Sequence, residues 1–169
     1  MKKNIVLIGF MGTGKTQIGK RVAKAMNRPF IDIDREIERT QRKRISDIFA
    51  EEGEEYFRYL ESKIIEEVSE INNQVIATGG GAVLNEKNLE ILRKNGVLIC
   101  LKASPEIIYN RIKTDDQRPL LSGEDLYKKI CELLAKREAK YMGADHLIDT
   151  SDLSIDEAAQ EIVDIASNK

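Results

Sequence analysis

Short apolar runs alternate with longer stretches of helical periodicity along the whole chain. The runs are rich in β-branched and aliphatic residues, as is typical of strands buried on both faces of a sheet. They occupy residues 4–10, 29–34, 74–78, 96–101 and 146–150. Because strands that alternate with helices form a parallel sheet with helices packed on both faces, the pattern predicts an α/β fold.

Apolar stripes mark the faces with which two helices are expected to pack against this sheet. The first stripe, after the opening run, consists of Ile18, Val22, Ala25 and Met26. The second stripe, which begins after Gly53, consists of Phe57, Leu60, Ile64, Val68 and Ile71. Residues three and four apart lie on one side of a helix, so both segments are predicted to be amphipathic helices. A further helix is expected at about 86–95.

Capping signals indicate where two helices begin in the second half of the chain. Ser104-Pro105-Glu106 combines an N-cap residue, a proline at the first helical position and an acid in the first turn, and predicts a helix to about Lys113. Ser154 and Glu157 have the spacing of a capping box at the start of a terminal helix. Between these helices, residues 114–125 are expected to form a mobile loop, followed by a helix to about Tyr141.

The composition is that of one globular domain. Of the 169 residues, 41% are hydrophobic and 33% are charged, and the formal net charge of −2 gives no basis for binding to nucleic acid or to a membrane. No apolar stretch reaches 18 residues and the N-terminal run is too short for a secretory signal, so a cytoplasmic location is expected. Cys100 and Cys131 lie far apart and are expected to be reduced thiols. Residues 1–169 are predicted to form one domain that acts as a monomer.

The first glycine-rich segment, "GFMGTGKT" at 9–16, is predicted to bind the phosphates of a nucleotide. It fits the pattern G-x-x-x-x-G-K-[ST] and lies between a buried strand and an amphipathic helix. In such a loop, backbone N–H groups and the helix N-terminus attract phosphate oxygens, the lysine reaches the β- and γ-phosphates, and the threonine hydroxyl coordinates Mg²⁺. The residues predicted to bind the nucleotide here are Gly12, Thr13, Gly14, Lys15, Thr16 and Gln17.

Other classes of nucleotide-binding protein fit less well. A dinucleotide-binding loop needs a glycine where the chain has Gln17. A GTPase should carry [NT]-K-x-D after a strand, but the nearest segment, "IKTD" at 112–115, has the wrong first residue and lies at a helix end. A small-molecule kinase is therefore the leading interpretation, and a nucleotide-dependent switch or binding module is the alternative from another class.

Five further motifs occur in a characteristic order. They are "DID" at 32–34, "GEEYFRYLE" at 53–61, "TGGGAV" at 78–83, "RPLL" at 118–121 and "REAKY" at 137–141. Together with the P-loop, in this order and spacing, they resemble shikimate kinases over essentially the whole chain. The resemblance implies a P-loop kinase fold with three α/β/α layers around five parallel strands, a substrate-binding segment at about 34–62 and a lid at about 114–124.

The resemblance also implies a role for individual residues. Asp34 would bind the acceptor hydroxyls and act as the base, and Asp32 would hold the water shell of Mg²⁺. Arg111 would lie against the adenine, and Arg118 would act on ATP from the lid, so the implied catalytic residues are Lys15, Asp34 and Arg118. The residues implied to bind the acceptor are Asp34, Arg58, Gly79, Gly80, Gly81 and Arg137, with both arginines on its carboxylate.

The implied reaction is transfer of the γ-phosphoryl group of ATP to the 3-hydroxyl of shikimate, with Mg²⁺ as cofactor. Glycine at 79–81 lets backbone N–H groups approach a small anionic acceptor closely, which explains a second loop of bare backbone. The alternative enzyme is a related P-loop kinase for another hydroxylated acid, such as gluconate.

Taken one at a time, several of these residues also have a purely structural interpretation. Asp34 is also a good N-cap for the segment "REIERT", and Arg58 has Glu54 and Glu61 at ion-pair spacing on a helix. Arg137 alone, in a charged helix, would be interpreted as a solvated side chain. The basic segment 39–44 departs from the family's usual pattern, so the substrate-binding segment is expected to differ in shape there.

Overall fold

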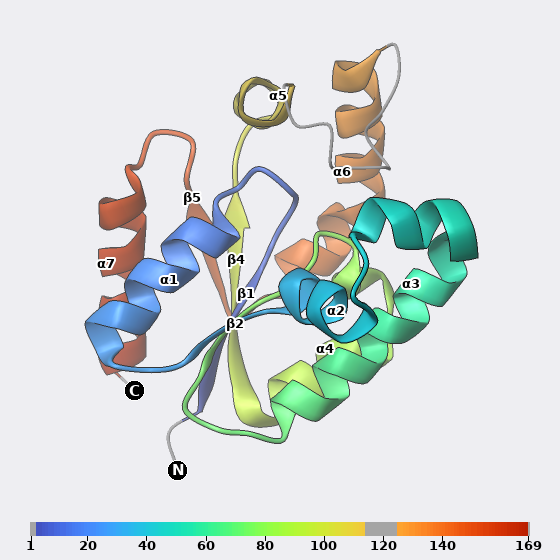
Figure 1. The fold of residues 1–169 in the computed structure, drawn as a ribbon. Helices are drawn as coiled ribbons and strands as arrows, with labels where there is room; N and C mark the ends of the chain where they lie inside the picture. Colours follow the sequence, from blue (N-terminus) through green and yellow to red (C-terminus); the bar gives the residue numbers. More distant parts are fainter. Residues whose placement is uncertain (1–2, 114–124, 169) are drawn as a thin grey trace.

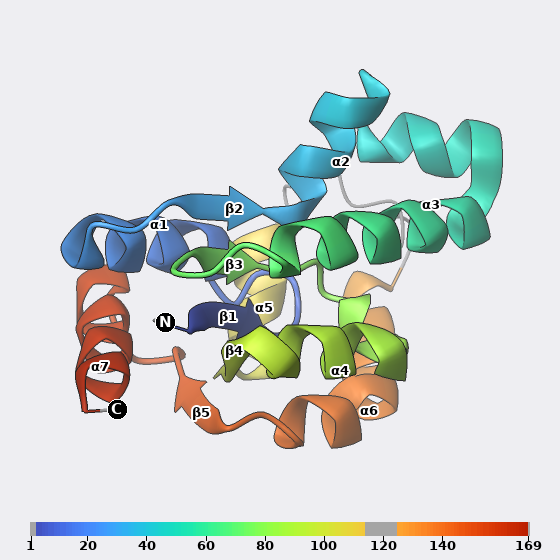
Figure 2. The ribbon, with the colours of Figure 1, turned by 90° about the horizontal axis from the view of Figure 1, so that it is seen from below.

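The computed structural model describes residues 3–113 and 125–168, and its centre is a five-stranded parallel sheet. The strand order is β2-β3-β1-β4-β5, so the first strand lies in the middle (Figures 1 and 2). The strands are β1 (Asn4–Ile8), β2 (Phe30–Asp32), β3 (Val75–Ala77), β4 (Gly96–Lys102) and β5 (His146–Asp149). Every adjacent pair is parallel, as the alternation of strands and helices predicts.

Burial explains why the central strands are continuous apolar runs. All five residues of β1 are buried, and it pairs with β3 on one side and β4 on the other. Both faces of a central strand are covered by helices, so neither face tolerates polar side chains. Asn4 is the polar exception, and its side chain accepts a hydrogen bond from Gln74 N and donates one to Ile71 O.

Two apolar clusters divide the helices between the two faces of the sheet. Residues of α1 (Lys15–Met26) and α7 (Ile155–Ser167) belong to one cluster, on the left in Figure 1. The other cluster contains residues of the remaining helices. They are α2 (Ile33–Gln41), α3 (Ile45–Ser69), α4 (Glu86–Asn95), α5 (Pro105–Ile112) and α6 (Leu126–Met142). A short 3₁₀ turn, η1 (Ala82–Leu84), follows the triple glycine. The three-layer α/β/α fold predicted from the resemblance is confirmed.

The capping predictions are confirmed. The Ser104 hydroxyl accepts a hydrogen bond from Ile107 N at the start of α5. At α7, Ser154 Oγ accepts from Glu157 N at 3.1 Å, and Glu157 Oε2 accepts from Ser154 N at 2.8 Å. No helix within 3–113 or 125–168 combines the length and the apolar character that a membrane span requires.

The structure corrects the sequence-based limits of one strand, β2, and of one helix, α3. Strand β2 ends at Asp32, whose carboxylate caps α2 by accepting from Arg35 N, so Asp34 lies in the first helical turn and is neither a strand residue nor the N-cap. Helix α3 begins at Ile45, well before Gly53, and bends at that glycine. It ends at Ser69, which leaves Ile71 outside the apolar stripe and 60% exposed.

The apolar stripe of α1 is also shifted. Ala25 is exposed, whereas Gly19 and Ala23 are buried. A Cβ atom at Gly19 would lie 2.5 Å from the Phe30 ring, so α1 approaches the sheet through its glycine and rotates its buried face accordingly. Ile18 and Val22 are buried as predicted.

Candidate active site

The predicted functional residues converge at the carboxyl ends of three neighbouring strands. The P-loop follows β1, Asp32 ends β2, and the triple glycine follows β3. Because these strands are parallel and adjacent, their carboxyl ends lie along one edge of the sheet. In open α/β sheets ligands bind at this edge.

The P-loop is held in a conformation that depends on glycine. Gly9, Gly12 and Gly14 have φ angles of 142°, 78° and 98°, which residues with a Cβ atom rarely adopt. A Cβ atom at Gly9 would also lie 2.3 Å from Leu101 O. The Lys15 ammonium folds back over the loop and donates to Gly9 O at 2.7 Å and Phe10 O at 2.9 Å. The loop therefore places a positive charge beside its own backbone at the start of α1, where phosphates bind.

Other residues of the P-loop segment have different surroundings. The Thr13 side chain is buried and its hydroxyl donates to Phe10 O at 2.7 Å, as does its backbone N–H at 3.4 Å. Thr13 thus closes the loop on itself. Gln17 is exposed on α1.

Thr16 and Asp32 form the candidate metal site. The Thr16 hydroxyl donates to Asp32 Oδ2 at 2.7 Å, which brings a hydroxyl and a carboxylate together beside the P-loop. Mg²⁺ in nucleotide sites is held by one or two such oxygens and otherwise by water and phosphate. The pair fits that role, and no cluster of three or more His, Cys, Asp or Glu capable of holding a metal occurs in the described part of the chain.

Arg111 and Thr150 clamp the P-loop from the side of β5. Arg111 Nη1 donates to Gly12 O at 3.0 Å, and Arg111 Nη2 donates to Thr150 O at 3.0 Å. The buried Thr150 hydroxyl lies within hydrogen-bond distance of Thr13 O at 3.0 Å and Lys102 O at 2.9 Å. Arg111 therefore lies at the P-loop, where an adenine contact stays a prediction. Nothing in the sequence pattern marked Thr150.

The triple glycine is surrounded by charged side chains. A Cβ atom at Gly79 would lie 2.7 Å from Glu61 Oε2 and 2.9 Å from Asp34 Oδ1. One at Gly81 would lie 2.3 Å from Arg58 Nη2, and one at Gly80 would lie 3.4 Å from Arg137 Nη1 and 3.2 Å from Met11 N. A side chain at 79 or 81 would displace these groups. Glycine at these positions therefore leaves room for the functional side chains to approach the loop.

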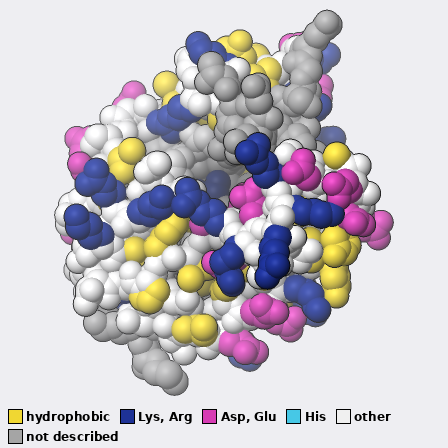
Figure 3. Space-filling view, in the orientation of Figure 1, with side chains coloured by type: hydrophobic (Ala, Val, Ile, Leu, Met, Phe, Trp, Pro, Cys, Tyr) yellow, Lys and Arg dark blue, Asp and Glu magenta, His cyan; other side chains and the backbone are white. Residues whose placement is uncertain are grey.

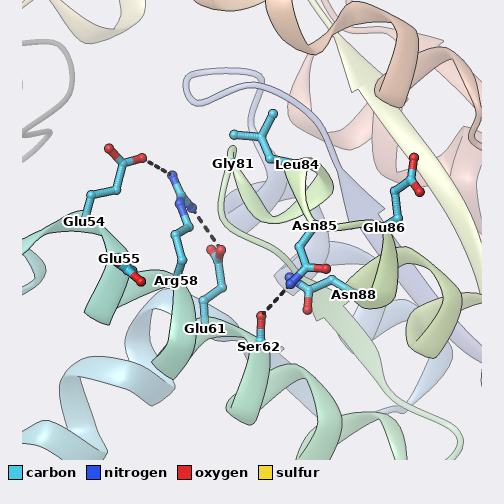
Figure 4. Close-up of a pocket in the computed structure, with 10 residues that line it drawn as sticks. All are labelled: Glu54, Glu55, Arg58, Glu61, Ser62, Gly81, Leu84, Asn85, Glu86 and Asn88. Atoms are coloured by element: carbon cyan, nitrogen blue, oxygen red, sulfur yellow. Dashed lines mark hydrogen bonds and ion pairs between the residues drawn. The ribbon is translucent and has the colours of Figure 1, made fainter.

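Arg58 is held between two carboxylates on α3 (Figure 4). Its Nη1 bonds Glu61 Oε1 at 2.9 Å, and its Nη2 lies 3.5 Å from Glu54 Oε1. Glu61 is 1% exposed, and burial raises the pKa of its carboxyl group while the Arg58 guanidinium acts in the opposite direction. Sequence reasoning treated Glu61 only as a partner in a surface ion pair. Its place in the "GEEYFRYLE" motif was the signal for a larger role.

Arg137 is buried, although the charged residues around it in the sequence predict an exposed side chain. It is 2% exposed and its guanidinium carbon lies 5.5 Å from the centre of the Phe10 ring. Among the described residues, no group accepts a hydrogen bond from its Nη1 atom. A buried guanidinium needs anionic or hydrogen-bonding partners, so this geometry favours an anionic ligand. The interpretation of Arg137 as a solvated side chain is wrong.

A cavity of about 790 Å³ adjoins this cluster and is lined by residues of α3, η1 and α4. Its lining includes Arg58, Glu61 and Gly81 (Figure 4). Pockets of 300–1,000 Å³ are typical of small-molecule sites. On the face seen in Figure 3, basic and acidic side chains are interspersed, so no single sign of charge dominates it.

Arg118, predicted to act from a lid at about 114–124, lies outside the described residues. The structure brings together Lys15, Thr16 and Asp32 at one end of the site and Asp34, Arg58, Arg137 and the glycines at the other.

A P-loop on a central parallel strand, beside a second loop that gathers two arginines and two carboxylates, defines a P-loop kinase with a small anionic acceptor. Comparison with known proteins supports this class of protein. The family model for shikimate kinase matches residues 11–167. The chain belongs to the shikimate kinase family, and it is therefore a phosphotransferase with a hydroxyl acceptor.

Individual relatives cover nearly the whole chain. The shikimate kinase of Caldanaerobacter subterraneus subsp. tengcongensis is 52% identical over 161 residues, which are 95% of this chain and 94% of the relative. That of Thermoanaerobacter pseudethanolicus is 51% identical over the same shares. Among solved structures, shikimate kinase from Acinetobacter baumannii in complex with shikimate has a TM-score of 0.95 at 38% identity, over 99% of this chain and 94% of that one. The Aquifex aeolicus enzyme has a TM-score of 0.85 at 33% identity, over 98% and 96%.

Proposed function

We propose that this protein transfers the γ-phosphoryl group of ATP to the 3-hydroxyl of shikimate, giving shikimate 3-phosphate and ADP. The observation that supports this most strongly is the surroundings of Gly80, where a Cβ atom would lie 3.2 Å from Met11 N of the P-loop and 3.4 Å from Arg137 Nη1. The predicted phosphate site and the predicted carboxylate site are therefore neighbours. Shikimate fits both ends, since it carries a carboxylate and hydroxyl groups on one small ring.

The nucleotide end supplies positive charge where the transferred group carries negative charge. Lys15 exchanges its two backbone carbonyl acceptors for phosphate oxygens when ATP binds. Thr16 and Asp32 would hold Mg²⁺, Asp32 through water, and the bound metal would neutralise charge on the phosphates. Phosphoryl transfer needs little covalent chemistry from the protein, so this charge neutralisation and the positioning of the reactants provide most of the acceleration.

The acceptor end orients the attacking hydroxyl. Arg58 and Arg137 hold the carboxylate, since a planar guanidinium can bond both of its oxygens. Asp34 lies at the same glycine loop, on the side of Gly79, and in this position it binds the hydroxyl groups and takes the proton as the new bond forms. Backbone N–H groups of 79–81 complete the acceptor site.

The proposal also assigns roles to the lid, to Arg111 and to the protein in the cell. Arg118 acts on the phosphates from the lid, and lid closure excludes the water that would otherwise hydrolyse ATP. Arg111 contacts the adenine. The protein works as a monomer in the cytoplasm, in the synthesis of aromatic amino acids, with ATP and shikimate as its small-molecule partners.

The test is an acceptor panel. ADP release and the phosphorylated product are measured with shikimate, quinate, gluconate and nucleoside monophosphates at equal concentrations. We expect shikimate to give the highest kcat/KM. A higher value for gluconate would favour the related sugar-acid kinase, and ATP hydrolysis without any phosphorylated acceptor would favour a switch or binding module.

Lys15→Ala is predicted to abolish turnover of the preferred acceptor while the protein stays folded. Lys20→Ala is the matched control, because Lys20 lies exposed on the same helix. Circular dichroism checks the fold of both variants. Full activity in folded Lys15→Ala protein would contradict the assignment of the phosphate site.

A further inference from the structure

Tyr141 is a buried residue of α6 that reaches into the triple-glycine loop. It is 5% exposed, and its hydroxyl donates a hydrogen bond to Gly80 O. It lies one helical turn after Arg137, and α6 therefore carries both the arginine and the tyrosine to the same glycine. None of the roles assigned above involves this hydroxyl.

The hydrogen bond acts on one of the two Gly–Gly peptides of the loop. Glycine on both sides of the Gly80–Gly81 peptide removes the Cβ contacts that usually fix its orientation. In a trans peptide the C=O of one residue and the N–H of the next point in opposite directions. A hydroxyl that holds Gly80 O therefore also fixes the direction of Gly81 N–H, and no backbone carbonyl of the loops and turns among the described residues accepts a hydrogen bond from this N–H.

Packing and the polar contact act together on the tyrosine. Its ring belongs to the buried apolar cluster and, with Phe10 and Cys100, also lines a cavity of about 310 Å³ between β4, α5 and α6. The hydroxyl is the part of the side chain that bonds the glycine loop. Burial raises the pKa of Tyr141 to about 12, although the nearby Arg137 guanidinium acts in the opposite direction, and the hydroxyl stays a donor at neutral pH.

We propose that Tyr141 is a positioning residue for the acceptor: its hydroxyl fixes the Gly80–Gly81 peptide so that Gly81 N–H faces the bound substrate. It does not touch the reacting atoms. It acts by keeping one backbone donor in the orientation that binding requires. This inference rests on the proposed function for its kinetic consequence, but the peptide orientation itself does not depend on the identity of the acceptor.

Tyr141→Phe tests the proposal, because it removes the hydroxyl and keeps the ring. A neutral hydrogen bond of ordinary strength corresponds to a change of about 3- to 10-fold. We expect KM for shikimate to rise by that factor, with kcat and KM for ATP changed by less than about twofold. Tyr127→Phe is the control, since it removes a hydroxyl from the same helix that donates to the exposed Glu106 rather than to the glycine loop.

A second measurement needs no substrate. In ¹⁵N-labelled protein, Tyr141→Phe should shift or broaden the amide resonances of Gly80 and Gly81, and Tyr127→Phe should leave them unchanged. Unchanged glycine resonances, or equal losses for shikimate and ATP, would overturn the proposal. If wild type failed to phosphorylate shikimate, the proposed function would fail, and the amide resonances would still decide the role of Tyr141.

Discussion

At the scale of single residues, the site depends on where buried charges lie. Glu61 combines near-complete burial with an ion pair to Arg58, and its second oxygen, Oε2, accepts no hydrogen bond from the described residues. An ionised carboxylate in that position is costly unless it is paired. Glu61 therefore orients Arg58 at the expense of stability.

The raised pKa of Glu61 predicts a pH dependence of stability. A carboxyl group whose pKa is higher in the folded than in the unfolded state favours folding below its unfolded pKa, and this contribution is lost as the pH rises through the folded pKa. Glu61→Gln removes the ionisation. We therefore expect the melting temperature of the variant, relative to wild type, to increase as the pH rises above about 4.

Glu66→Gln is the control for this prediction. Glu66 lies on the same helix and is exposed, so its replacement should leave the difference from wild type nearly constant with pH. A difference between Glu61→Gln and wild type that is constant, or that falls as the pH rises, would show that burial does not destabilise the ionised form.

At the scale of elements, α3 bends at Gly53, and the segment after the bend carries Arg58, which lies beside the glycine loop. Gly53 has φ 85° and ψ 172° inside the helix, a conformation that is essentially restricted to glycine. A Cβ atom there would meet no atom within 4 Å, so an alanine would be opposed by backbone conformation alone. The bend separates a first segment, which begins at Ile45, from the segment that carries Arg58 and Glu61.

Gly53→Ala is predicted to lower the free energy of unfolding by about 1–3 kcal/mol, the usual cost of such backbone strain. It should also lower kcat/KM for shikimate, because the Arg58 segment would rotate as the strain relaxes. Chemical denaturation and steady-state kinetics measure the two effects. Gly143→Ala is the control, since Gly143 has φ −77°, which alanine adopts readily. Equal stability of Gly53→Ala and wild type would contradict the assigned conformation.

The elements also show what the sequence could predict and what it could not. Strands and caps follow from local patterns, so β1, β4 and the capping box of α7 were predictable. The helical segment before Gly53 was not, because the apolar stripe that marks the helix begins only after this glycine. The end of β2 at Asp32 depends on a cap that competes with strand alternation, and alternation alone favoured a longer strand.

At the scale of the whole molecule, the site is assembled from parts distant in the sequence. The P-loop and the triple glycine become neighbours because β1 and β3 pair in parallel. Arg137 and Tyr141 reach them from α6, about sixty residues further along the chain. The charged composition of α6 predicts exposure, and only the tertiary structure shows that Arg137 is buried. Motifs predicted the residues that the structure gathers at this edge of the sheet, whereas the contacts of Glu61, Thr150 and Tyr141 came only from the structure.

The central claim is that Arg58 and Arg137 hold the carboxylate of the acceptor beside the phosphate site. Arg58→Lys and Arg137→Lys each remove a planar, bidentate donor, and loss of a hydrogen bond to a charged group costs about 1.5–3 kcal/mol. That corresponds to a loss of roughly 10- to 150-fold in kcat/KM for shikimate. The affinity for ATP should change little, because neither arginine lies at the Thr16–Asp32 pair.

The most direct measurement combines each lysine variant with removal of the carboxylate, using shikimate and its carboxamide as acceptors. The wild-type enzyme should already use the carboxamide poorly, and neither substitution should reduce that rate much further, so the two losses should be strongly non-additive in kcat/KM. Strictly additive losses would mean that the arginines do not contact the carboxylate, and would contradict the proposed binding of the acceptor.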